Sequence, residues 1–328
     1  MSGLARMGIV GAGAWGTALA LAAARAGREV VLFGRDAGAI KAIASARENA
    51  RYLPGVTLPA AIAPTADPGA LAGLPVLIVA VPAQSLSAAL AGIAIAPGAV
   101  VVIAAKGIDR ASGRFLSEIA TEAAPEASVA LLSGPSFAAD VGRGLPTAVT
   151  LAHPAEATGM ALAAALGSPT FRPYWTADLR GVELGGALKN VLAIAAGIVV
   201  GRALGESARA ALIARGFAEM TRLGRALGAK AETFAGLSGL GDLVLTATSG
   251  QSRNLRFGLA LGRGEEAAGA SARIGTVEGV ATASAASALA DRLKIEAPIT
   301  AEVARVVEGR DTIDVAIERL MRRPLRAE

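Results

Sequence analysis

The stretch Gly8-Ile9-Val10-Gly11-Ala12-Gly13-Ala14-Trp15-Gly16 decides the fold. The residues Met7 to Val10 are typical of a short buried strand, and the pattern G-x-G-x-x-G follows them and opens an alanine-rich helix, Trp15 to Ala24. In this context Gly11, Gly13 and Gly16 let the backbone approach a pyrophosphate, and the helix N-terminus offers it N–H groups and partial positive charge. The pattern therefore predicts a dinucleotide site; a tight turn without function is the alternative.

The first half of the chain alternates short β-branched runs with alanine-rich stretches, as a parallel sheet with crossover helices requires. From Asp178 onward, apolar residues recur at helical spacing and no convincing strand is left. The fold class is therefore α/β in residues 1–178, a Rossmann domain with a doubly wound, mostly parallel sheet, followed by an all-α domain in residues 179–328. The expected strands are 7–10, 30–33, 76–81, 100–104, 129–132, 148–152 and 170–174, and the expected crossover helices are 15–24, 37–47, 85–91, 113–123 and 155–166.

Composition excludes several classes of protein. The 328 residues are 53% hydrophobic and 18% charged, which is unlike a disordered chain, and the net charge of +5 is spread without a basic arm, so no nucleic-acid partner is expected. Glycines and prolines interrupt the two longest uncharged stretches, 7–24 and 68–105, so no transmembrane segment is predicted. The absence of cysteine excludes disulfides and thiolate chemistry and fits a cytoplasmic protein.

The end of the second predicted strand bears on the choice of cofactor. A site specific for NAD usually places a carboxylate about 20 residues after the glycine pattern, where it holds the ribose hydroxyls. Here Gly34 stands near that place and Arg35 follows it. An arginine there can pair with a 2′-phosphate, so NADP is favoured over NAD. Asp36, the next residue, is equally suited to cap the following helix.

A dehydrogenase needs a group that exchanges a proton with an alcohol, and few residues are available. The one histidine, His153, is expected in a surface loop after a strand, and Lys41, Lys230 and Lys294 are expected on the solvated surface. Two lysines remain. Lys106 directly follows a strand, at the sheet edge where open α/β folds bind ligands. Lys189 lies among apolar and small residues, where partial desolvation favours a neutral amine that acts as a base, although a lysine extending from a core helix is the plain alternative.

Two polar segments are further candidates. Ser133-Gly134-Pro135-Ser136 closes a strand at the same sheet edge, although by spacing alone it is equally a turn. Asp242 ends a glycine-rich run, and Ser252-Arg253-Asn254 follows it. An arginine fork with neutral donors beside it suits a phosphate, whereas a loop and a helix cap explain the same residues without function.

Eight segments taken in order closely resemble the bacterial-type NAD(P)-dependent sn-glycerol-3-phosphate dehydrogenase family, over nearly the whole chain. The segments are GAGAWGTALA (11–20), RYLPGVTLP (51–59), AAKG (104–107), SGPSFA (133–138), ELGGALKNVLAIAAG (183–197), TFAGLSGLGDLVLT (233–246), SRN (252–254) and TVEG (276–279). The resemblance implies a Rossmann domain joined to an all-helical domain, and interconversion of sn-glycerol 3-phosphate and dihydroxyacetone phosphate with NAD(P)H. It also implies a role in glycerophospholipid synthesis and a homodimer.

The resemblance also implies roles for single residues. Lys189 would be the proton donor and acceptor at the substrate oxygen, and Lys106 would contact both substrate and cofactor. Arg253 would be shared between the substrate phosphate and the cofactor. The other substrate-binding residues would be Gly134, Ser136, Asp242, Ser252 and Asn254. The other cofactor-binding residues, besides Gly11, Gly13 and Gly16, would be Ala14, Trp15, Arg35, Tyr52, Ala138, Val277 and Glu278.

Two alternatives stay open beside this hypothesis. The first is a related Rossmann reductase of a 2-keto acid or a sugar phosphate, although Ser252-Arg253-Asn254 with Lys106 and Ser136 suits a phosphate better than a planar carboxylate. The second is a non-catalytic, nucleotide-binding redox sensor, which would not need Lys189. No metal is expected, because a protonated lysine already supplies the positive charge that a metal provides elsewhere.

Overall fold

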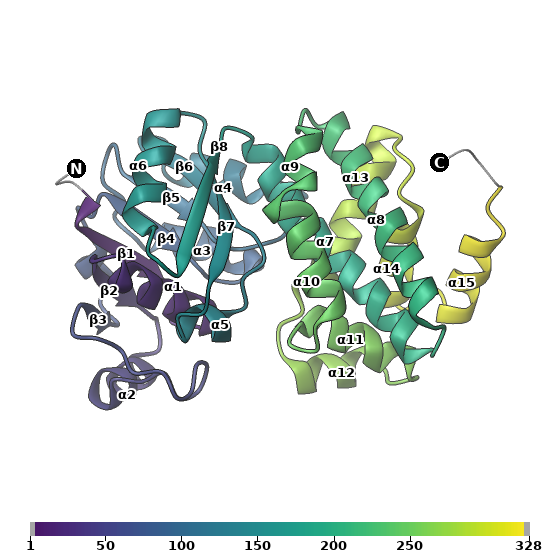
Figure 1. Ribbon diagram of the computed structural model, residues 1–328, viewed down its shortest axis with the longest axis horizontal. Coiled ribbons are helices and arrows are strands. Elements are labelled where there is room, and N and C mark those ends of the chain that lie inside the picture. The colour runs from purple at the N-terminus through teal and green to yellow at the C-terminus, as the bar shows by residue number, and fades with distance from the viewer. Residues whose placement is uncertain (1–3, 325–328) are drawn as a thin grey trace. The chain divides into compact units, whose positions relative to one another are not determined.

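The computed structural model describes residues 4–324, and the chain divides into two compact units. The first comprises Met1–Lys106 and Arg114–Glu183, and the second comprises Gly107–Gly113 and Leu184–Glu328. In Figure 1 the first unit runs from purple to teal and the helices of the second run from teal through green to yellow. The division falls inside helix α7 (Leu179–Gly201), and the short segment after Lys106 belongs with the helical unit.

An eight-stranded sheet forms the centre of the first unit, in the order β3-β2-β1-β4-β5-β6-β7-β8. Neighbouring strands are parallel except β6 and β7, which are antiparallel, so the predicted mostly parallel sheet is confirmed. The strand order reverses around β1, at the point where open α/β sheets bind their ligands. The strands are β1 (Arg6–Val10), β2 (Glu29–Phe33), β3 (Ile62–Thr65), β4 (Val76–Val79), β5 (Val100–Ile103), β6 (Ser128–Ser133), β7 (Thr147–Ala152) and β8 (Phe171–Thr176).

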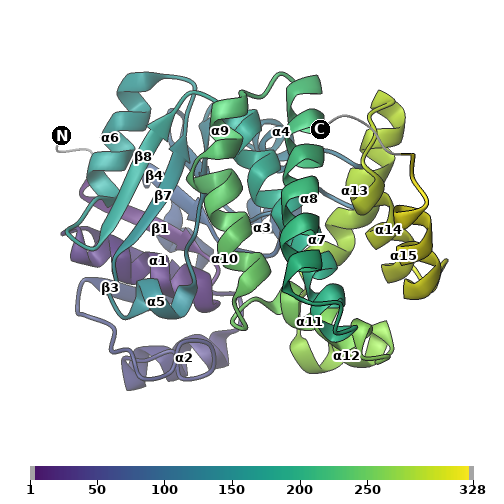
Figure 2. The ribbon, with the colours of Figure 1, turned by 45° about the vertical axis from the view of Figure 1, so that its right-hand side comes forward.

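Helices cover both faces of this sheet. Leu19 of α1 and Leu162 of α6 belong to the apolar core on one face, and Leu86 of α3 and Leu116 of α4 belong to the core on the other. Helices α1 and α5 lie side by side in both ribbon views (Figure 2). The helices are α1 (Ala14–Arg25), α2 (Ala37–Ala46), α3 (Leu86–Ala91), α4 (Leu116–Ala123), α5 (Ala138–Gly142) and α6 (Glu156–Leu166), with short 3-10 turns at Pro68–Leu71 and Ala83–Ser85.

All seven strands expected from the sequence are present, with ends shifted by at most two residues. The sequence did not predict β3, which has only four residues and contains Pro64. Proline cannot donate a ladder hydrogen bond, and it is tolerated here because β3 is an edge strand that pairs with β2 alone.

The second unit is helical, and no strand occurs in residues 184–324. A π-helical turn, Leu237–Gly241, leads directly into α10. After α7 the helices are α8 (Glu206–Ala226), α9 (Ala231–Ala235), α10 (Asp242–Thr248), α11 (Arg253–Gly262), α12 (Ala267–Ile274), α13 (Glu278–Leu293), α14 (Pro298–Val307) and α15 (Ile313–Met321).

Helix α7 is the core helix of this unit. Among the described residues it is the one helix long and apolar enough to cross a membrane by length and composition, but 89% of its most apolar 18-residue window is buried within the protein. Its side chains are buried on all sides from Gly181 to Val199, as expected for a helix surrounded by other helices.

Glycines bring α7 and α11 into close contact. A Cβ atom added at Gly197 of α7 would lie 2.2 Å from the carbonyl oxygen of Leu255, and one added at Gly258 of α11 would lie 2.0 Å from that of Ile194. The two helix backbones therefore touch at a crossing that admits no side chain at either position. This crossing fixes α11, which begins at Arg253, against the helix that carries Lys189.

Candidate functional site

The glycine loop joins the end of β1 to the start of α1, in the middle of the sheet. Strand β1 pairs with β2 on one side and with β4 on the other, so the loop leaves the sheet where the strand order reverses. Gly11 has a φ of +111°, and a Cβ atom added at Gly16 would lie 1.8 Å from the Gly11 carbonyl oxygen. Only glycine fits either position, and the turn brings the start of α1 directly over the strand end.

The loop also leaves space and donors for an anion. A Cβ atom added at Gly13 would have no protein heavy atom within 4 Å, so the volume above the loop is open. No side chain caps the N-terminus of α1, and the indole Nε1 of Trp15 is buried without a hydrogen-bond partner. Helix N–H groups that lack a side-chain cap are suited to a phosphate, so the loop fits the pyrophosphate of a dinucleotide.

The end of β2 offers no acidic side chain at the position that NAD-specific sites use. A Cβ atom added at Gly34 would lie 2.8 Å from Ile40 Cδ1 and 3.0 Å from Ala12 Cβ, so a side chain there would have to displace these two neighbours. Arg35 is exposed, and the Asp36 carboxylate accepts a hydrogen bond from the N–H of Ala39 at 3.0 Å. Asp36 is therefore an N-cap of α2, and Arg35 beside it is the basic group exposed at this strand end.

Two strand ends of the first unit bring three predicted substrate residues together. Lys106 Nζ, after β5, donates to the carbonyl oxygen of Gly134, after β6, at 3.2 Å. The Ser136 hydroxyl donates to the same oxygen at 3.0 Å. Gly134 has a φ of +140°, and an added Cβ atom would lie 2.9 Å from Val149 Cα, so the turn requires glycine. An ammonium group and a hydroxyl thus share one carbonyl at the carboxyl edge of the sheet.

Tyr52 and Ala138 lie on segments that contact each other. Tyr52 is 48% exposed, and the Arg51 guanidinium lies 5.1 Å from the centre of its ring. Ala138 begins α5, and a Cβ atom added at Gly142 of that helix would lie 2.7 Å from Leu53 Cδ2. The loop that carries Tyr52 therefore packs against α5.

In the second unit, Lys189 and Asp242 form a buried ion pair. Lys189 Nζ on α7 donates to Asp242 Oδ1 at 2.7 Å and to the Thr246 hydroxyl at 2.7 Å. Thr246 in turn donates to Asp242 Oδ1 at 3.2 Å. Lys189 is 7% exposed and Asp242 is 1% exposed. The side chain of Lys189 is thus oriented by two partners on one helix, and the alternative of a lysine extending to the surface is wrong.

A second polar group lies one residue further along α7. The amide of Asn254 on α11 donates to Asn190 Oδ1 at 2.8 Å, and Asn254 Oδ1 accepts from the N–H of Gly279 at 3.0 Å. The amide nitrogen of Asn190 is buried without a hydrogen-bond partner. Asn254 therefore links α7 to the start of α13, where Val277 is the N-cap and Glu278 is the first helical residue.

Arg253 and Ser252 begin α11. The Ser252 hydroxyl accepts from the N–H of Leu255 at 3.1 Å, so the helix-cap interpretation of Ser252 is confirmed. Arg253 is exposed, while Ser252 and Asn254 on either side are buried. The guanidinium is thus accessible to a ligand, beside two polar residues that are fixed within the fold.

The start of α7, which belongs to the first unit, carries another buried carboxylate. Glu183 accepts hydrogen bonds from both the N–H and the hydroxyl of Ser117, each at 2.8 Å. Burial raises the pKa of Glu183, and the bonds from Ser117 oppose that rise.

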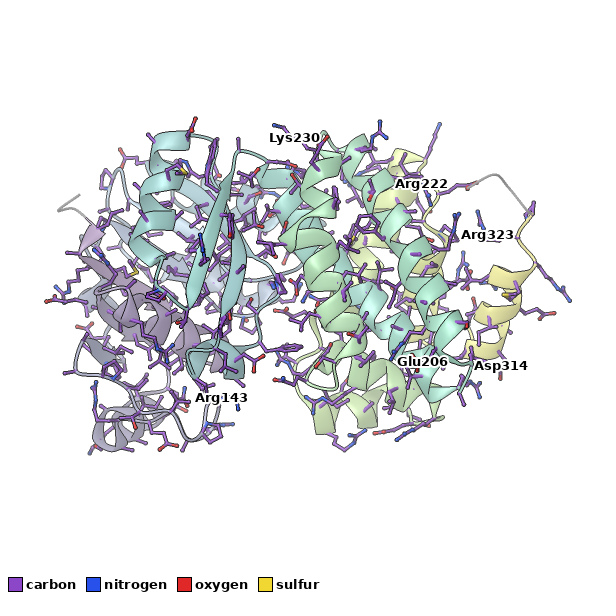
Figure 3. The ribbon with its side chains drawn as sticks, viewed as in Figure 1. Arg143, Glu206, Arg222, Lys230, Asp314 and Arg323 are labelled. Atoms are coloured by element: carbon purple, nitrogen blue, oxygen red, sulfur yellow. The ribbon has the colours of Figure 1, made fainter. Side chains whose placement is uncertain are left out.

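The expectation of a surface loop for His153 is wrong. The residue is 3% exposed, and its N–H donates to the carbonyl oxygen of Thr176 at 3.0 Å, directly after the end of β7. Its ring Nδ1 accepts from the N–H of Ala155 at 3.1 Å. The expectation for Lys41, Lys230 and Lys294 is confirmed, since all three are exposed, and Figure 3 shows Lys230 at the surface. Across residues 4–324 no three histidine, aspartate or glutamate side chains gather as metal ligands.

Two family models account for most of the chain. The model of the N-terminus of NAD-dependent glycerol-3-phosphate dehydrogenase matches residues 6–159, and the model of its C-terminus matches residues 178–318. The chain belongs to the NAD-dependent glycerol-3-phosphate dehydrogenase family. The resemblance of the eight sequence segments is thereby confirmed.

Relatives within the glycerol-3-phosphate dehydrogenase family match over the full length. A glycerol-3-phosphate dehydrogenase [NAD(P)+] from a Bradyrhizobium species is 57% identical over 98% of this chain and 97% of its own. The enzyme of the same name from Azorhizobium caulinodans is 55% identical over 100% of both chains. The crystal structure of glycerol-3-phosphate dehydrogenase from Coxiella burnetii superposes with a TM-score of 0.92, at 39% identity, covering 97% of this chain and 99% of that one.

A reductase outside the glycerol-3-phosphate dehydrogenase family shares the fold alone. A ketopantoate reductase of the PanE/ApbA family from Ralstonia eutropha superposes with a TM-score of 0.60 at 19% identity, over 96% of this chain and 99% of that one. Its likeness is far weaker than that of the Coxiella enzyme, which separates the family from the alternative of a 2-keto acid reductase.

Sequence reasoning missed two polar residues that this member of the glycerol-3-phosphate dehydrogenase family places beside the candidates. Thr246 lies four residues after Asp242, so a helix puts both on one face, and that spacing was available as a signal. Asn190 follows Lys189 and is an amide in an otherwise apolar helix; it is 2% exposed. A buried amide within an apolar run calls for a partner, and that requirement was a weaker signal for Asn254.

Proposed function

We propose that this protein interconverts sn-glycerol 3-phosphate and dihydroxyacetone phosphate, with residues 1–178 binding NAD(P) and residues 179–328 binding substrate and carrying the proton transfer. The observation that supports this most directly is the buried Lys189–Asp242–Thr246 group on α7 and α10. Membership in the glycerol-3-phosphate dehydrogenase family supports the substrate and the cofactor class.

Lys189 is the proposed proton donor and acceptor at the oxygen on C2 of the substrate. When bound, the reduced nicotinamide supplies the hydride that reaches C2 of dihydroxyacetone phosphate. Lys189 Nζ then gives a proton to the developing alkoxide, and in the reverse direction it removes that proton. Asp242 Oδ1 and the Thr246 hydroxyl, both 2.7 Å from Nζ, hold the amine in place.

The substrate phosphate is assigned to Arg253, with Ser252 and Asn254 beside it. An exposed guanidinium offers a fork of donors that suits a phosphate, and the buried neighbours limit the movement of its backbone. Lys106, Gly134 and Ser136 of the first unit are also assigned to the substrate. Their mutual hydrogen bonds support this assignment, because they hold an ammonium and a hydroxyl at one strand edge.

For the cofactor, the pyrophosphate is assigned to the loop of Gly11, Gly13, Ala14, Trp15 and Gly16. We assign the 2′-phosphate of NADP to Arg35, because Gly34 stands where NAD-specific sites place the carboxylate that binds the ribose, and Arg35 is exposed next to it. Gly34 and Arg35 together support a preference for NADP over NAD. The remaining assigned cofactor contacts are Tyr52, Lys106, Ala138, Arg253, Val277 and Glu278.

The test is NADPH oxidation, followed by absorbance, with dihydroxyacetone phosphate set against pyruvate and ketopantoate. The proposed function predicts turnover of dihydroxyacetone phosphate and little or none of the two keto acids. Preferred turnover of ketopantoate would favour the related reductase instead, and binding of NADPH without turnover of any of the three would favour the redox sensor.

The setting of the reaction is proposed from the family. Glycerol 3-phosphate formed here would feed glycerophospholipid synthesis in the cytoplasm, and two copies of the chain would form a homodimer. Light scattering on the purified protein measures the oligomeric state directly: a mass near 65 kDa, twice the 32.5 kDa of one chain, is expected.

A further inference from the structure

The buried side chain of Asn49 forms hydrogen bonds to the glycine loop. It lies in the connection between α2 and β3 and is 2% exposed. Its amide nitrogen donates to the carbonyl oxygen of Ala12 at 3.0 Å and to the hydroxyl of Thr17 at 2.8 Å. The Asn49 amide therefore donates one hydrogen bond to the glycine loop and one to the first turn of α1, and both partners lie more than 30 positions before it in the sequence.

The bond to Ala12 determines where the next N–H points. The peptide bond between Ala12 and Gly13 is trans, and in a trans peptide the C=O and the following N–H point in opposite directions. Because Asn49 holds the Ala12 carbonyl toward the protein interior, the N–H of Gly13 is directed away from it. An added Cβ atom at Gly13 would meet nothing within 4 Å, so the protein leaves space beside this peptide that a ligand can occupy.

Without Asn49, the Ala12 carbonyl would lose its buried donor and the peptide would be less restrained. A carbonyl oxygen that turned outward would face the pyrophosphate with a negative partial charge, and an N–H would turn away from it. Restraining one peptide thus removes a repulsive arrangement as well as supplying a donor.

The backbone of Asn49 also forms hydrogen bonds to the loop that carries Tyr52, a residue assigned to the cofactor. Its carbonyl oxygen accepts from the N–H of Tyr52 at 3.1 Å and from that of Leu53 at 2.8 Å. The loop that carries Tyr52 is therefore fixed to the residue that orients the glycine loop.

We propose that Asn49 is a positioning residue for dinucleotide binding, which acts through the Ala12–Gly13 peptide and does not itself touch the cofactor. This inference rests on the proposed assignment of the pyrophosphate to the glycine loop. Since NADPH and NADH share the pyrophosphate, Asn49 contributes equally to the binding of both.

The experiment measures the Kd of NADPH and of NADH for Asn49→Ala by calorimetry, together with steady-state kinetics. We expect both Kd values to rise by about 10-fold or more, which is the loss of roughly one hydrogen bond to a charged group. At saturating NADPH, kcat and the KM of dihydroxyacetone phosphate should stay within about twofold of the parent, because Asn49 contacts neither the lysine nor the phosphate site.

The matched control is Ser117→Ala in the same unit, which removes the side-chain hydrogen bond of another buried residue, from its hydroxyl to Glu183. Both variants should lower the melting temperature, but only Asn49→Ala should weaken the cofactors. If Asn49→Ala loses stability and leaves both Kd values within about twofold, Asn49 is merely structural and the inference is wrong. A parent protein that binds neither cofactor would instead overturn the proposed function.

A second variant tests the role of the donor where Asn49→Ala fails to fold. Asn49→Asp keeps the shape of the side chain but, when ionised, presents only acceptors to the Ala12 carbonyl. It should weaken NADPH and NADH at least as much as Asn49→Ala. Parent-like affinity of Asn49→Asp would mean that shape and not the donated bond matters, and would overturn the inference.

Discussion

The two units provide their candidate sites by different means. The glycine loop of the first unit offers backbone N–H groups and open space, and the side chains beside it, Arg35 and Tyr52, are exposed. The helical unit offers side chains that are buried and paired, above all Lys189 and Asp242. The site in the first unit thus depends on backbone groups and on the absence of side chains, and the site in the helical unit depends on specific side chains.

This difference determines how each site fails. A backbone site is damaged by adding an atom where a ligand must approach, whereas a buried side-chain site is damaged by removing one. Proton transfer depends on a single titratable group, so its loss affects the rate. Pyrophosphate binding is distributed over several N–H groups, so the loss of one contact affects affinity gradually.

The largest effect is expected at the side-chain site. Lys189→Met should lower kcat by about 100-fold to 10,000-fold, the usual contribution of general acid–base catalysis, because the methionine keeps the bulk and loses the proton carrier. The Kd of NADPH should stay near that of the parent. Stopped-flow and steady-state rates give kcat, and a value within about threefold of the parent would remove Lys189 from this role.

Arg253→Ala tests the phosphate anchor and should have the next largest effect. Its kcat/KM for dihydroxyacetone phosphate should fall by about 100-fold, because the remote phosphate contact places C2 correctly. Dihydroxyacetone lacks the phosphate, so the parent should use it poorly and the mutation should cost it much less. The Kd of NADPH is measured separately to correct for the assigned cofactor contact, and an equal loss for both ketones would assign the phosphate to Lys106 and Ser136.

Arg35→Ala tests an exposed side chain of the first unit. NADPH should lose about 10-fold to 150-fold in affinity, the range of one charge-assisted bond, while NADH should change little because it has no 2′-phosphate. Titrations with both cofactors give the comparison. Equal losses would show that Arg35 serves the adenine or the loop and not the phosphate.

Gly13→Ala tests the backbone site itself, with the smallest expected effect. The φ of Gly13, −81°, suits alanine, and the added methyl group meets no protein atom, so the melting temperature should change little. The methyl group would occupy ligand space and should weaken NADPH and NADH alike, by about 10-fold. Gly92→Ala, at φ −91° with its nearest neighbour 4.0 Å away, is the matched control and should change neither quantity. If Gly13→Ala binds both cofactors as the parent does, the pyrophosphate does not approach the loop there.

The same difference explains what the sequence could predict. The glycine loop is a local pattern that follows a strand, so spacing alone located it, and β-branched runs located seven strands. Lys189 and Asp242 are 53 positions apart, and nothing local states that they meet. Their pairing depends on how α7 and α10 pack, and the hydrogen bond between Asn254 and Asn190 depends on how α11 and α7 pack. The burial of His153 was missed because strand pairing with Thr176 extends beyond the apolar run that marked β7.

The crossing of α7 and α11 has a consequence for how this chain can evolve. At Gly197 and Gly258 an added carbon would meet a backbone oxygen of the other helix at 2.2 Å and 2.0 Å, so substitution there cannot be absorbed by a flexible side chain. Selection acting through the spacing of the two helices would keep both glycines, although neither carries any chemistry. A map of invariant positions across descendants of this gene would mark these two glycines as strongly as Lys189, and invariance alone would not tell the scaffold from the catalyst.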